Sequence, residues 1–263
     1  MSYDLESHQP TVLFIGGHDP SGGAGLQADL ETAMAYGCRA TSLVTCLTVQ
    51  DTRDVQAVHP QSVAQFLQQA EALTDDLPPS IVKVGLLGDP DIAQATAELV
   101  RRLQVPLVLD PVLAAGGGSP LAGEALLQVI RERLLPLTTL LTPNRAESRR
   151  LAQTDNDSHA AAALLKLGAS NVLVTGADES AGDQVTNRLV NNHEDVTFCW
   201  PLLPHTYHGS GCTLASACAC EMALGTADIT KAVKKAQQFT WQALEAAEAP
   251  GSGQWLPTRR SPT

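Results

Sequence analysis

A short segment in the last quarter of the chain combines residue types that could bind an anion and move a proton. Gly209, Ser210 and Gly211 precede Cys212, and the apolar run that follows predicts a helix over Cys212–Leu224. Backbone N–H groups at a helix start carry the positive end of the helix dipole, which favours a phosphate or a developing negative charge. The same field is expected to lower the pKa of the Cys212 thiol. A capped helix start with a buried thiol is the structural alternative.

A second segment that could contact a ligand is rich in glycine and runs from Gly16 to Gly25. It follows the first predicted strand, where glycine lets the backbone approach a ligand closely. The segment has no Gly-Lys-[Ser/Thr] ending and lacks the spacing of a dinucleotide fingerprint, which excludes a Walker A loop and a Rossmann-type site. An ordinary glycine-rich turn is the alternative interpretation.

Carboxylates follow two further predicted strands. Asp110 ends one of them and precedes the glycines at 116–118, which would allow the loop to move as a lid. Asn144 and Glu147 follow the next strand, and their spacing places the amide and the carboxylate on one helix face, where they could organise Mg²⁺ and its waters. A helix-start cap explains Asn144 and Glu147 equally well.

The elements that must position these segments alternate along the chain. Short β-branched runs alternate with longer amphipathic stretches, which is typical of βαβ units around a mostly parallel sheet. The predicted strands are Thr11–Ile15, Thr41–Thr48, Ile81–Gly85, Leu107–Asp110, Thr139–Leu141 and Asn171–Val174, with a less regular pair around Leu189–Trp200. The predicted helices are Gly25–Tyr36, Gln61–Leu73, Pro90–Leu103, Gly123–Leu134, Arg145–Gln153, His159–Leu167, Cys212–Leu224 and Ile229–Ala247. Because parallel strands end at one edge of such a sheet, the four segments are expected to form a single cleft.

Composition and periodicity favour one domain over residues 1–263, with its core between about 11 and 249. The sequence contains no repeat, no low-complexity tract and no change in composition that would mark a linker. In the first predicted helix, Leu26, Leu30, Ala33 and Met34 recur at helical spacing and are expected to share one face.

Composition also excludes several classes of function. The chain has 17 Lys and Arg against 28 Asp and Glu, a net charge of −11 and only 4% aromatic residues, so no nucleic-acid partner is expected. Its longest mainly apolar stretches fall far short of the ~20 residues of a membrane helix. The polar, acidic N-terminal residues have no signal-peptide pattern, and the six cysteines are expected to be reduced thiols, so the expected location is the cytoplasm.

In chain order, these segments resemble the ribokinase-like superfamily and, more closely, the hydroxymethylpyrimidine/phosphomethylpyrimidine kinases of thiamine biosynthesis. The resemblance spans Val12 to Ala247 and rests on Asp19–Asp29, Leu47–Thr52, Lys83–Leu87, Asp110–Val112, Thr142–Asn144 with Glu147, and His208–Leu214. It implies a mostly parallel central sheet with helices on both faces, the use of ATP and Mg²⁺, and a homodimer. The implied reaction transfers the ATP γ-phosphate to the hydroxymethyl group of 4-amino-5-hydroxymethyl-2-methylpyrimidine, and then a second phosphate to the resulting monophosphate.

The resemblance also implies roles for individual residues. The anion hole would be formed by Gly209, Ser210, Gly211 and Cys212, and Cys212 would accept the proton of the hydroxyl group. Mg²⁺ and its waters would be held around the phosphates by Asp110, Asn144 and Glu147, with the two carboxylates as metal ligands. Gln50 would face the pyrimidine, because an amide can donate and accept toward an aminopyrimidine edge. The rest of the substrate pocket would be lined by Gly17, Asp19, Ala24, Leu86 and Val112.

One segment departs from the family pattern. Where many members carry Lys-Gly-Gly-His after the sixth strand, this chain has Thr175 and Gly176 followed by Ala177 and Asp178. The hydroxyl group of Thr175 could still donate to a phosphate oxygen of the nucleotide, but the positive charge of the lysine is lost. The second phosphorylation is expected to suffer more than the first, because its acceptor already carries a phosphate.

Two other functions stay open on the sequence. A pyridoxal or pyridoxine kinase shares the implied fold and phosphorylates a similar heteroaromatic alcohol, although Cys212 and Gln50 argue against the branch that uses aspartate as base. A homologue that binds the ligand without catalysing a reaction would keep the cleft. This function stays open because Thr175 stands where many family members have a lysine. The presence of Asp110, Glu147 and Cys212 favours catalysis.

Overall fold

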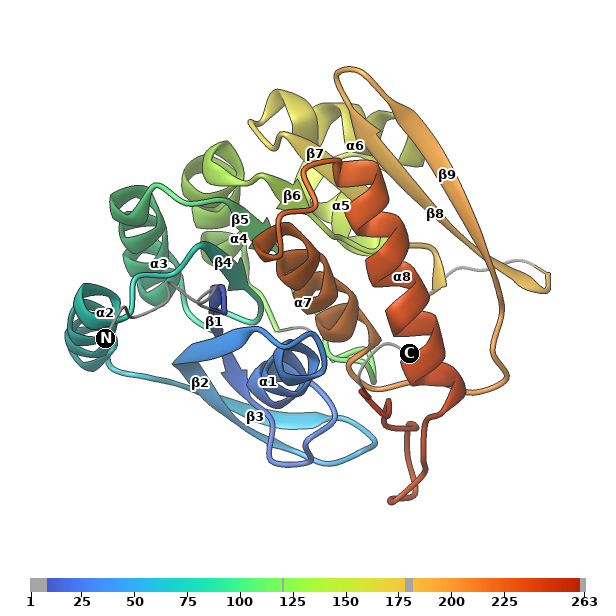
Figure 1. Ribbon diagram of the computed structural model, residues 1–263, viewed down its shortest axis with the longest axis horizontal. Helices are drawn as coiled ribbons and strands as arrows, with labels where there is room; N and C mark the ends of the chain where they lie inside the picture. The colour runs from blue at the N-terminus through green and yellow to red at the C-terminus, as the bar shows by residue number, and fades with distance from the viewer. Residues whose placement is uncertain (1–8, 120, 178–181, 261–263) are drawn as a thin grey trace, which may run out of the picture.

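The computed structural model describes residues 9–119, 121–177 and 182–260. Within these residues the strands form one nine-stranded sheet in the order β3-β2-β1-β4-β5-β6-β7-β8-β9 (Figure 1). The strands are β1 (Thr11–His18), β2 (Arg39–Gln50), β3 (Val55–Pro60), β4 (Ile81–Val84), β5 (Leu107–Leu109), β6 (Leu140–Leu141), β7 (Asn171–Val174), β8 (Gln184–Asn191) and β9 (Asp195–Pro201). In the central part of the sheet, the neighbouring strands β2, β1, β4, β5, β6 and β7 pair in parallel. Strand β3 pairs antiparallel at one edge, and β8 and β9 pair antiparallel at the other. The predicted mostly parallel α/β sheet is confirmed.

Strand β1 shows why the sheet lies in the middle of the molecule. Its residues Val12, Leu13, Phe14 and Ile15 are fully buried. Leu13 and Ile15 belong to one hydrophobic cluster, whereas Val12 and Phe14 belong to another on the opposite face. A continuous apolar run of this kind is typical of a parallel strand that helices cover on both sides.

The helices form the two outer layers. One face is covered by α1 (Gly25–Ala35), α7 (Ser210–Ala223) and α8 (Ile229–Glu245), which lie together in Figure 1. The other face is covered by α2 (Val63–Asp76), α3 (Pro90–Leu103), α4 (Glu124–Val129), the π turn η1 (Ile130–Leu134), the 3-10 turn η2 (Leu135–Leu137), α5 (Arg145–Ala152) and α6 (Asp157–Lys166). Among the described residues, no helix has both the length and the apolar character needed to span a membrane.

The sequence prediction missed the edge strand β3. Its residues Val55–Pro60 are mostly half-buried or exposed, so they lack the apolar run that marks the central strands. Strand β2 extends to Gln50 and pairs with β3 across the turn at 51–54. The pair predicted around 189–200 is a regular antiparallel hairpin, β8 with β9, that begins five residues earlier, at Gln184.

Two helix predictions also need correction. The helix expected over 123–134 is an α-helix only to Val129 and continues as a π turn. In α1, the four residues expected to share one face differ in burial: Leu26 and Ala33 are buried, but Leu30 is 38% and Met34 is 71% exposed. The reason is that α1 turns Asp29 toward the core. A search for apolar periodicity leaves out a buried aspartate and so misplaces the buried face of the helix.

Candidate active site

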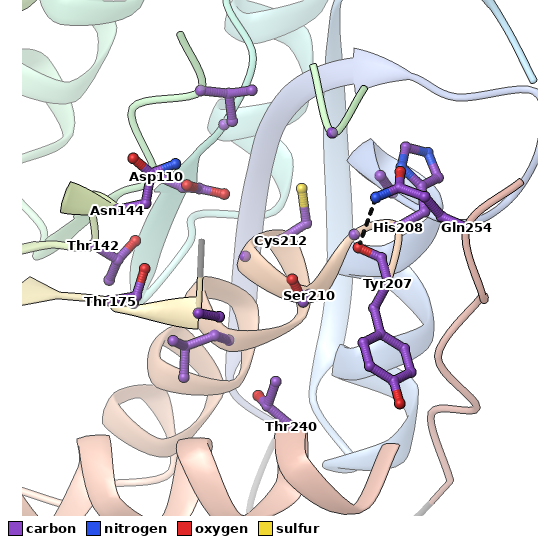
Figure 2. A pocket seen from close by; sticks show the side chains of 18 of the residues that line it. Asp110, Thr142, Asn144, Thr175, Tyr207, His208, Ser210, Cys212, Thr240 and Gln254 are labelled. Carbon is purple, nitrogen blue, oxygen red and sulfur yellow. Dashed lines mark hydrogen bonds between the residues drawn. The ribbon is translucent and has the colours of Figure 1, made fainter. Parts of the chain in front are cut away.

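A cavity of about 550 Å³ lies at the carboxyl edge of the sheet, where β1, β2, β5, β6 and β7 end beside the start of α7. Every residue that the sequence predicts for the site lines it. These residues are Gly17, Asp19, Ala24, Gln50, Leu86, Asp110, Val112, Asn144, Glu147, Thr175, Gly209, Ser210, Gly211 and Cys212. Figure 2 shows Asp110, Asn144, Thr142 and Thr175 on one side of Cys212, and Tyr207, His208 and Gln254 on the other. The predicted convergence on one cleft is therefore present in the fold.

The start of α7 has the geometry of an anion hole. Gly209 adopts a left-handed conformation with φ 76°, and a Cβ atom at this position would lie 2.0 Å from the carbonyl oxygen of Gly23. Only glycine fits there, so the loop can turn sharply into the helix. The first turn of α7 contains no acidic residue, and Ser210 and Gly211 both line the cavity. The free N–H groups of this helix start are thus available to an anion.

Asp19 connects the glycine-rich loop to the segment before α7. It is 1% exposed, and its Oδ2 atom accepts hydrogen bonds from Nε2 of His208 and from the backbone N–H of Ala24, both at 2.8 Å. Its Oδ1 atom accepts from the backbone N–H of Ser21 at 2.8 Å. Burial raises the pKa of Asp19, but the hydrogen bonds from His208 and Ser21 outweigh it and hold the pKa below its usual value. The Asp19 carboxylate thus binds protein donors and fixes the shape of both loops.

A buried ion pair lies beneath the cavity. Lys83 is fully buried in β4, and its Nζ atom lies 2.8 Å from Oδ1 of Asp29 and 4.0 Å from Oδ2 of Asp110. Ser216 donates to the same Asp29 oxygen at 2.6 Å. Burial lowers the pKa of Lys83, but the nearby negative charges, chiefly Asp29, and the hydrogen bond to Asp29 together outweigh burial and raise it, so Lys83 is a cation. The sequence analysis assigned Lys83 no role. Its place inside an otherwise apolar four-residue strand was the signal that could have marked it as a functional residue.

Asp110 has the properties of a cation ligand. Its Oδ2 atom is buried and has no hydrogen-bond partner among the residues that the structure describes. Burial raises the pKa of Asp110 to about 6, with a smaller rise from Asp29 and a partial offset from Lys83 and from a hydrogen bond with Cys212. A buried carboxylate oxygen that lacks a donor is costly unless a cation or a proton binds it. Asp110 therefore fits the magnesium ion that the family resemblance implies.

Asn144 and Glu147 form a capping box at the start of α5. Asn144 Oδ1 accepts from the N–H of Glu147 at 2.8 Å, and Glu147 Oε2 accepts from the N–H of Asn144 at 3.0 Å. Glu147 Oε1 accepts from the N–H of Leu113 at 3.1 Å. Because both Glu147 oxygens already accept backbone hydrogen bonds, this carboxylate fits Mg²⁺ best through a water molecule. Among the described residues no three His, Cys, Asp or Glu side chains could hold a metal unaided, and Mg²⁺ commonly shares its ligands with substrate phosphates.

The structure corrects the prediction of a lowered thiol pKa at Cys212. Burial, together with the negative charges of Asp110 and Asp29, raises the pKa of Cys212 to about 12. The positive charge of Lys83 and a hydrogen bond from the backbone of Gly25 lower it only partly. The helix start alone would have favoured the thiolate, but the tertiary structure adds two carboxylates and partly buries the thiol. In the protein alone, Cys212 is a thiol at neutral pH.

The side of the cavity next to Gly17 is mainly apolar and narrow. Leu86 and Val112 line it beside Gly17, where a Cβ atom would lie 3.0 Å from Sγ of Cys46. Gln50 lies at the end of β2, and its side-chain amide donates to Oγ1 of Thr48 at 2.7 Å. An apolar pocket with one oriented amide is typical of a small heteroaromatic ligand.

Sequence reasoning missed a polar network at the far end of the cavity. Asn187 on β8 accepts from the N–H of Gly176 at 3.0 Å and donates to Gln237 on α8 at 2.8 Å. Trp200 on β9 donates to the same Gln237 oxygen at 3.0 Å. Thr175 lies beside this network and lines the cavity, whereas Asp178 lies outside the described residues. Nothing in the sequence signals the network, because its members come from three separate elements.

Comparisons with known proteins identify the family of the chain. The family model for phosphomethylpyrimidine kinase matches residues 19–258. The hydroxymethylpyrimidine/phosphomethylpyrimidine kinase of Synechococcus elongatus is 36% identical over 258 residues, covering 93% of this chain and 95% of that protein. An ADP complex of Bacillus subtilis pyridoxal kinase has a TM-score of 0.87 at 27% identity, covering 96% of this chain and 98% of that one. A phosphomethylpyrimidine kinase from Clostridium difficile 630 has a TM-score of 0.78 at 30% identity, covering 90% of this chain and 99% of that one.

Proposed function

The chain belongs to the phosphomethylpyrimidine kinase family, and we propose that it phosphorylates 4-amino-5-hydroxymethyl-2-methylpyrimidine, and then its monophosphate, with ATP in thiamine biosynthesis. The observation that carries the proposal is the meeting of the α7 start, Asp110 and Cys212 in one cavity with a narrow apolar side. A donor phosphate chain and a small aromatic alcohol would fit the two sides of Cys212. The solved neighbours support the ribokinase-like fold that this activity uses.

Binding and positioning come first in the proposed reaction. Leu86, Val112 and Gln50 hold the pyrimidine on the narrow side and aim its hydroxymethyl group at Cys212. The N–H groups of Ser210 and Gly211 receive the γ-phosphate, whose charge is spread over its outer oxygens during transfer. Such fixed donors act without reorganising when the charge moves, which is the main source of catalysis in reactions of this kind.

Proton transfer depends on the neighbours of Cys212. Mg²⁺ held by Asp110, with Asn144 and Glu147 around its waters, would neutralise phosphate charge and weaken the carboxylate repulsion that raises the thiol pKa. Lys83 and the α7 start would then favour the thiolate, which forms when the Cys212 thiol releases its proton to solvent. The hydroxymethyl oxygen forms a bond to the γ-phosphorus, the bond from that phosphorus to ADP breaks, and Cys212 Sγ accepts the hydroxyl proton.

A direct assay tests the proposal. ADP release is measured with Mg·ATP and, in parallel, with hydroxymethylpyrimidine, its monophosphate and pyridoxal as acceptors. We expect turnover on both pyrimidines, with a lower kcat/KM on the monophosphate because Thr175 supplies no positive charge. Absence of turnover on every acceptor would contradict the proposal and favour a ligand-binding protein without catalysis.

A pyridoxal kinase is the second candidate. The Bacillus subtilis pyridoxal kinase has the higher TM-score of the two solved structures, 0.87 against 0.78 for the Clostridium difficile phosphomethylpyrimidine kinase. Turnover on pyridoxal alone would identify this activity, and turnover on all three acceptors would mean a dual one. We also propose that the protein works in the cytoplasm as a homodimer, and sedimentation of the purified protein tests its oligomeric state.

A further inference from the structure

The chain after α8 returns to the cavity as a strap, defined here as residues 251–259 and drawn in red in Figure 1. Its return is fixed by a backbone pair in which Glu248 and Leu256 exchange hydrogen bonds of 2.8 and 3.0 Å. Its first contacts are with the turn between β2 and β3. Gln254 donates its backbone N–H to the carbonyl oxygen of Thr52 at 2.7 Å, and a Cβ atom on Gly253 would lie only 2.1 Å from that oxygen. The strap therefore packs its backbone directly on this turn.

The strap then pairs with the segment that leads into α7. Trp255 donates to the carbonyl oxygen of Thr206, and His208 donates to the carbonyl oxygen of Trp255, both at 2.9 Å. The side chain of Gln254 donates to the carbonyl oxygen of Tyr207 at 3.4 Å and lines the cavity (Figure 2). The strap thus holds the residues just before the anion hole.

Arg259 completes the strap behind the anion hole. Its side chain is 1% exposed, and its guanidinium donates to the carbonyl oxygen of Gly23 and, at 2.9 Å, to Oγ1 of Thr213. Thr213 in turn donates to the carbonyl oxygen of Gly209 at 2.8 Å. Arg259 therefore braces both sides of the close contact between Gly23 and Gly209 that shapes the hole.

The charge of Arg259 points to the same role. A cation at the positive end of a helix is unfavourable by itself. Glu31, 2.8 Å from the guanidinium, offsets part of the charge. The remaining positive field at the α7 start becomes favourable when an anion binds, because the anion interacts with the helix end and the cation together.

We propose that Arg259 is a positioning residue for phosphoryl transfer, which holds the N–H groups of the anion hole in place through Gly23 and Thr213. The inference rests on the proposed kinase activity. No contact of Arg259 with substrate is required, since its effect passes through the backbone of Gly209. The strap then contributes to the site by holding the anion hole in place.

The test compares Arg259→Gln with Arg260→Gln, a matched control at an exposed neighbour. Three quantities are measured: ADP release with Mg·ATP and hydroxymethylpyrimidine, thermal unfolding, and amide hydrogen exchange of the peptide 205–214. In Arg259→Gln we expect kcat to fall roughly 10- to 100-fold because the hole is misplaced, with KM for the pyrimidine unchanged. The peptide should exchange faster, whereas Arg260→Gln should match the wild type.

Two further variants keep the test decisive. Thr213→Val preserves side-chain size and removes the hydroxyl group that accepts from Arg259 and donates to Gly209, so it should lower kcat even if Arg259→Gln fails to fold. Arg259→Lys keeps the charge but cannot reach three divergent acceptors, so it should stay impaired. A wild-type kcat in Arg259→Lys or Thr213→Val would overturn the inference. A loss of kcat in Arg260→Gln equal to that in Arg259→Gln would overturn it as well. An inactive wild type would refute the kinase proposal instead, and unchanged exchange in Arg259→Gln would still refute the bracing role.

Discussion

Asp19 and Asp110 end different strands at the same edge of the sheet, and both were predicted for the site. Both are buried, at 1% and 5% exposure. The oxygens of Asp19 accept hydrogen bonds from His208, Ala24 and Ser21, and its pKa is lowered. Asp110 keeps a buried oxygen that has no hydrogen-bond partner in the described part of the chain, and burial raises its pKa to about 6. One carboxylate thus stabilises the loops, while the other is left to a ligand.

The contrast between Asp19 and Asp110 shows that burial alone does not determine whether a carboxylate is structural or is open to a ligand. The number of protein donors decides it, because each hydrogen bond stabilises the charged form and occupies a lone pair that a ligand would need. The β1–α1 loop supplies such donors, since its backbone folds around Asp19. The end of β5 supplies few, since the N–H of Leu113 is used by Glu147.

The largest effect is expected from Cys212→Ala, which removes the thiol that we propose as the proton acceptor beside Asp110. Turnover should fall by roughly 10²- to 10⁴-fold with little change in ATP affinity. Steady-state kinetics and calorimetric titration with ATP measure the two quantities. Cys199→Ala removes an exposed thiol and is the control. A Cys212→Ala enzyme that turns over normally would exclude this thiol from the reaction.

Asp110→Asn should lower kcat by roughly 10²- to 10³-fold, because the site loses a charge that acts during transfer. The wild type should lose kcat/KM below pH about 6, where Asp110 takes up a proton. The raised folded-state pKa means that ionisation of Asp110 destabilises the fold as pH rises from the ordinary value to about 6. Unfolding of Asp110→Asn at pH 8 should therefore occur at or above the wild-type temperature. A clear drop would show that Asp110 is structural.

Asp19→Asn should have the opposite effect, with its main loss in the stability of the fold. Its bonds with His208, Ser21 and Ala24 should make the loss about 1–3 kcal/mol in the free energy of unfolding. Because the pKa of Asp19 is lowered, its contribution is present above the ordinary pKa and is lost as pH falls through the folded-state value. Denaturant unfolding at pH 7 and at pH 3 measures this. Equal stability of variant and wild type at pH 7 would remove the contrast with Asp110.

The smallest effect is expected from Gln50→Ala on the substrate side. The amide contacts only the pyrimidine in the proposed reaction, so KM for hydroxymethylpyrimidine should rise roughly tenfold with little change in kcat. Initial rates at saturating ATP give both constants, and KM for ATP in the same variant is the internal control. An unchanged KM for the pyrimidine would mean that Gln50 faces away from it.

Much of the fold and the site could be predicted from the sequence. The central strands and most helices follow from local patterns, since a parallel strand buried on both faces must be apolar along its length. The glycine-rich loop, Asp110 and the helix start at 210 could be found because each follows a recognisable strand or opens a helix. Strand β3 could not be found in this way, because an edge strand with half-exposed faces has no comparable pattern.

What the sequence alone determined is which residues reach the carboxyl edge of the sheet and in what order. Only the tertiary structure decided their chemical states. It placed Asp29 and Asp110 near Cys212 and so raised a thiol pKa that the helix start was expected to lower. It also brought Arg259 behind Gly209, 50 residues away in the chain. The reason is physical: charge, burial and hydrogen bonding depend on distances in space, and segments far apart in sequence set those distances.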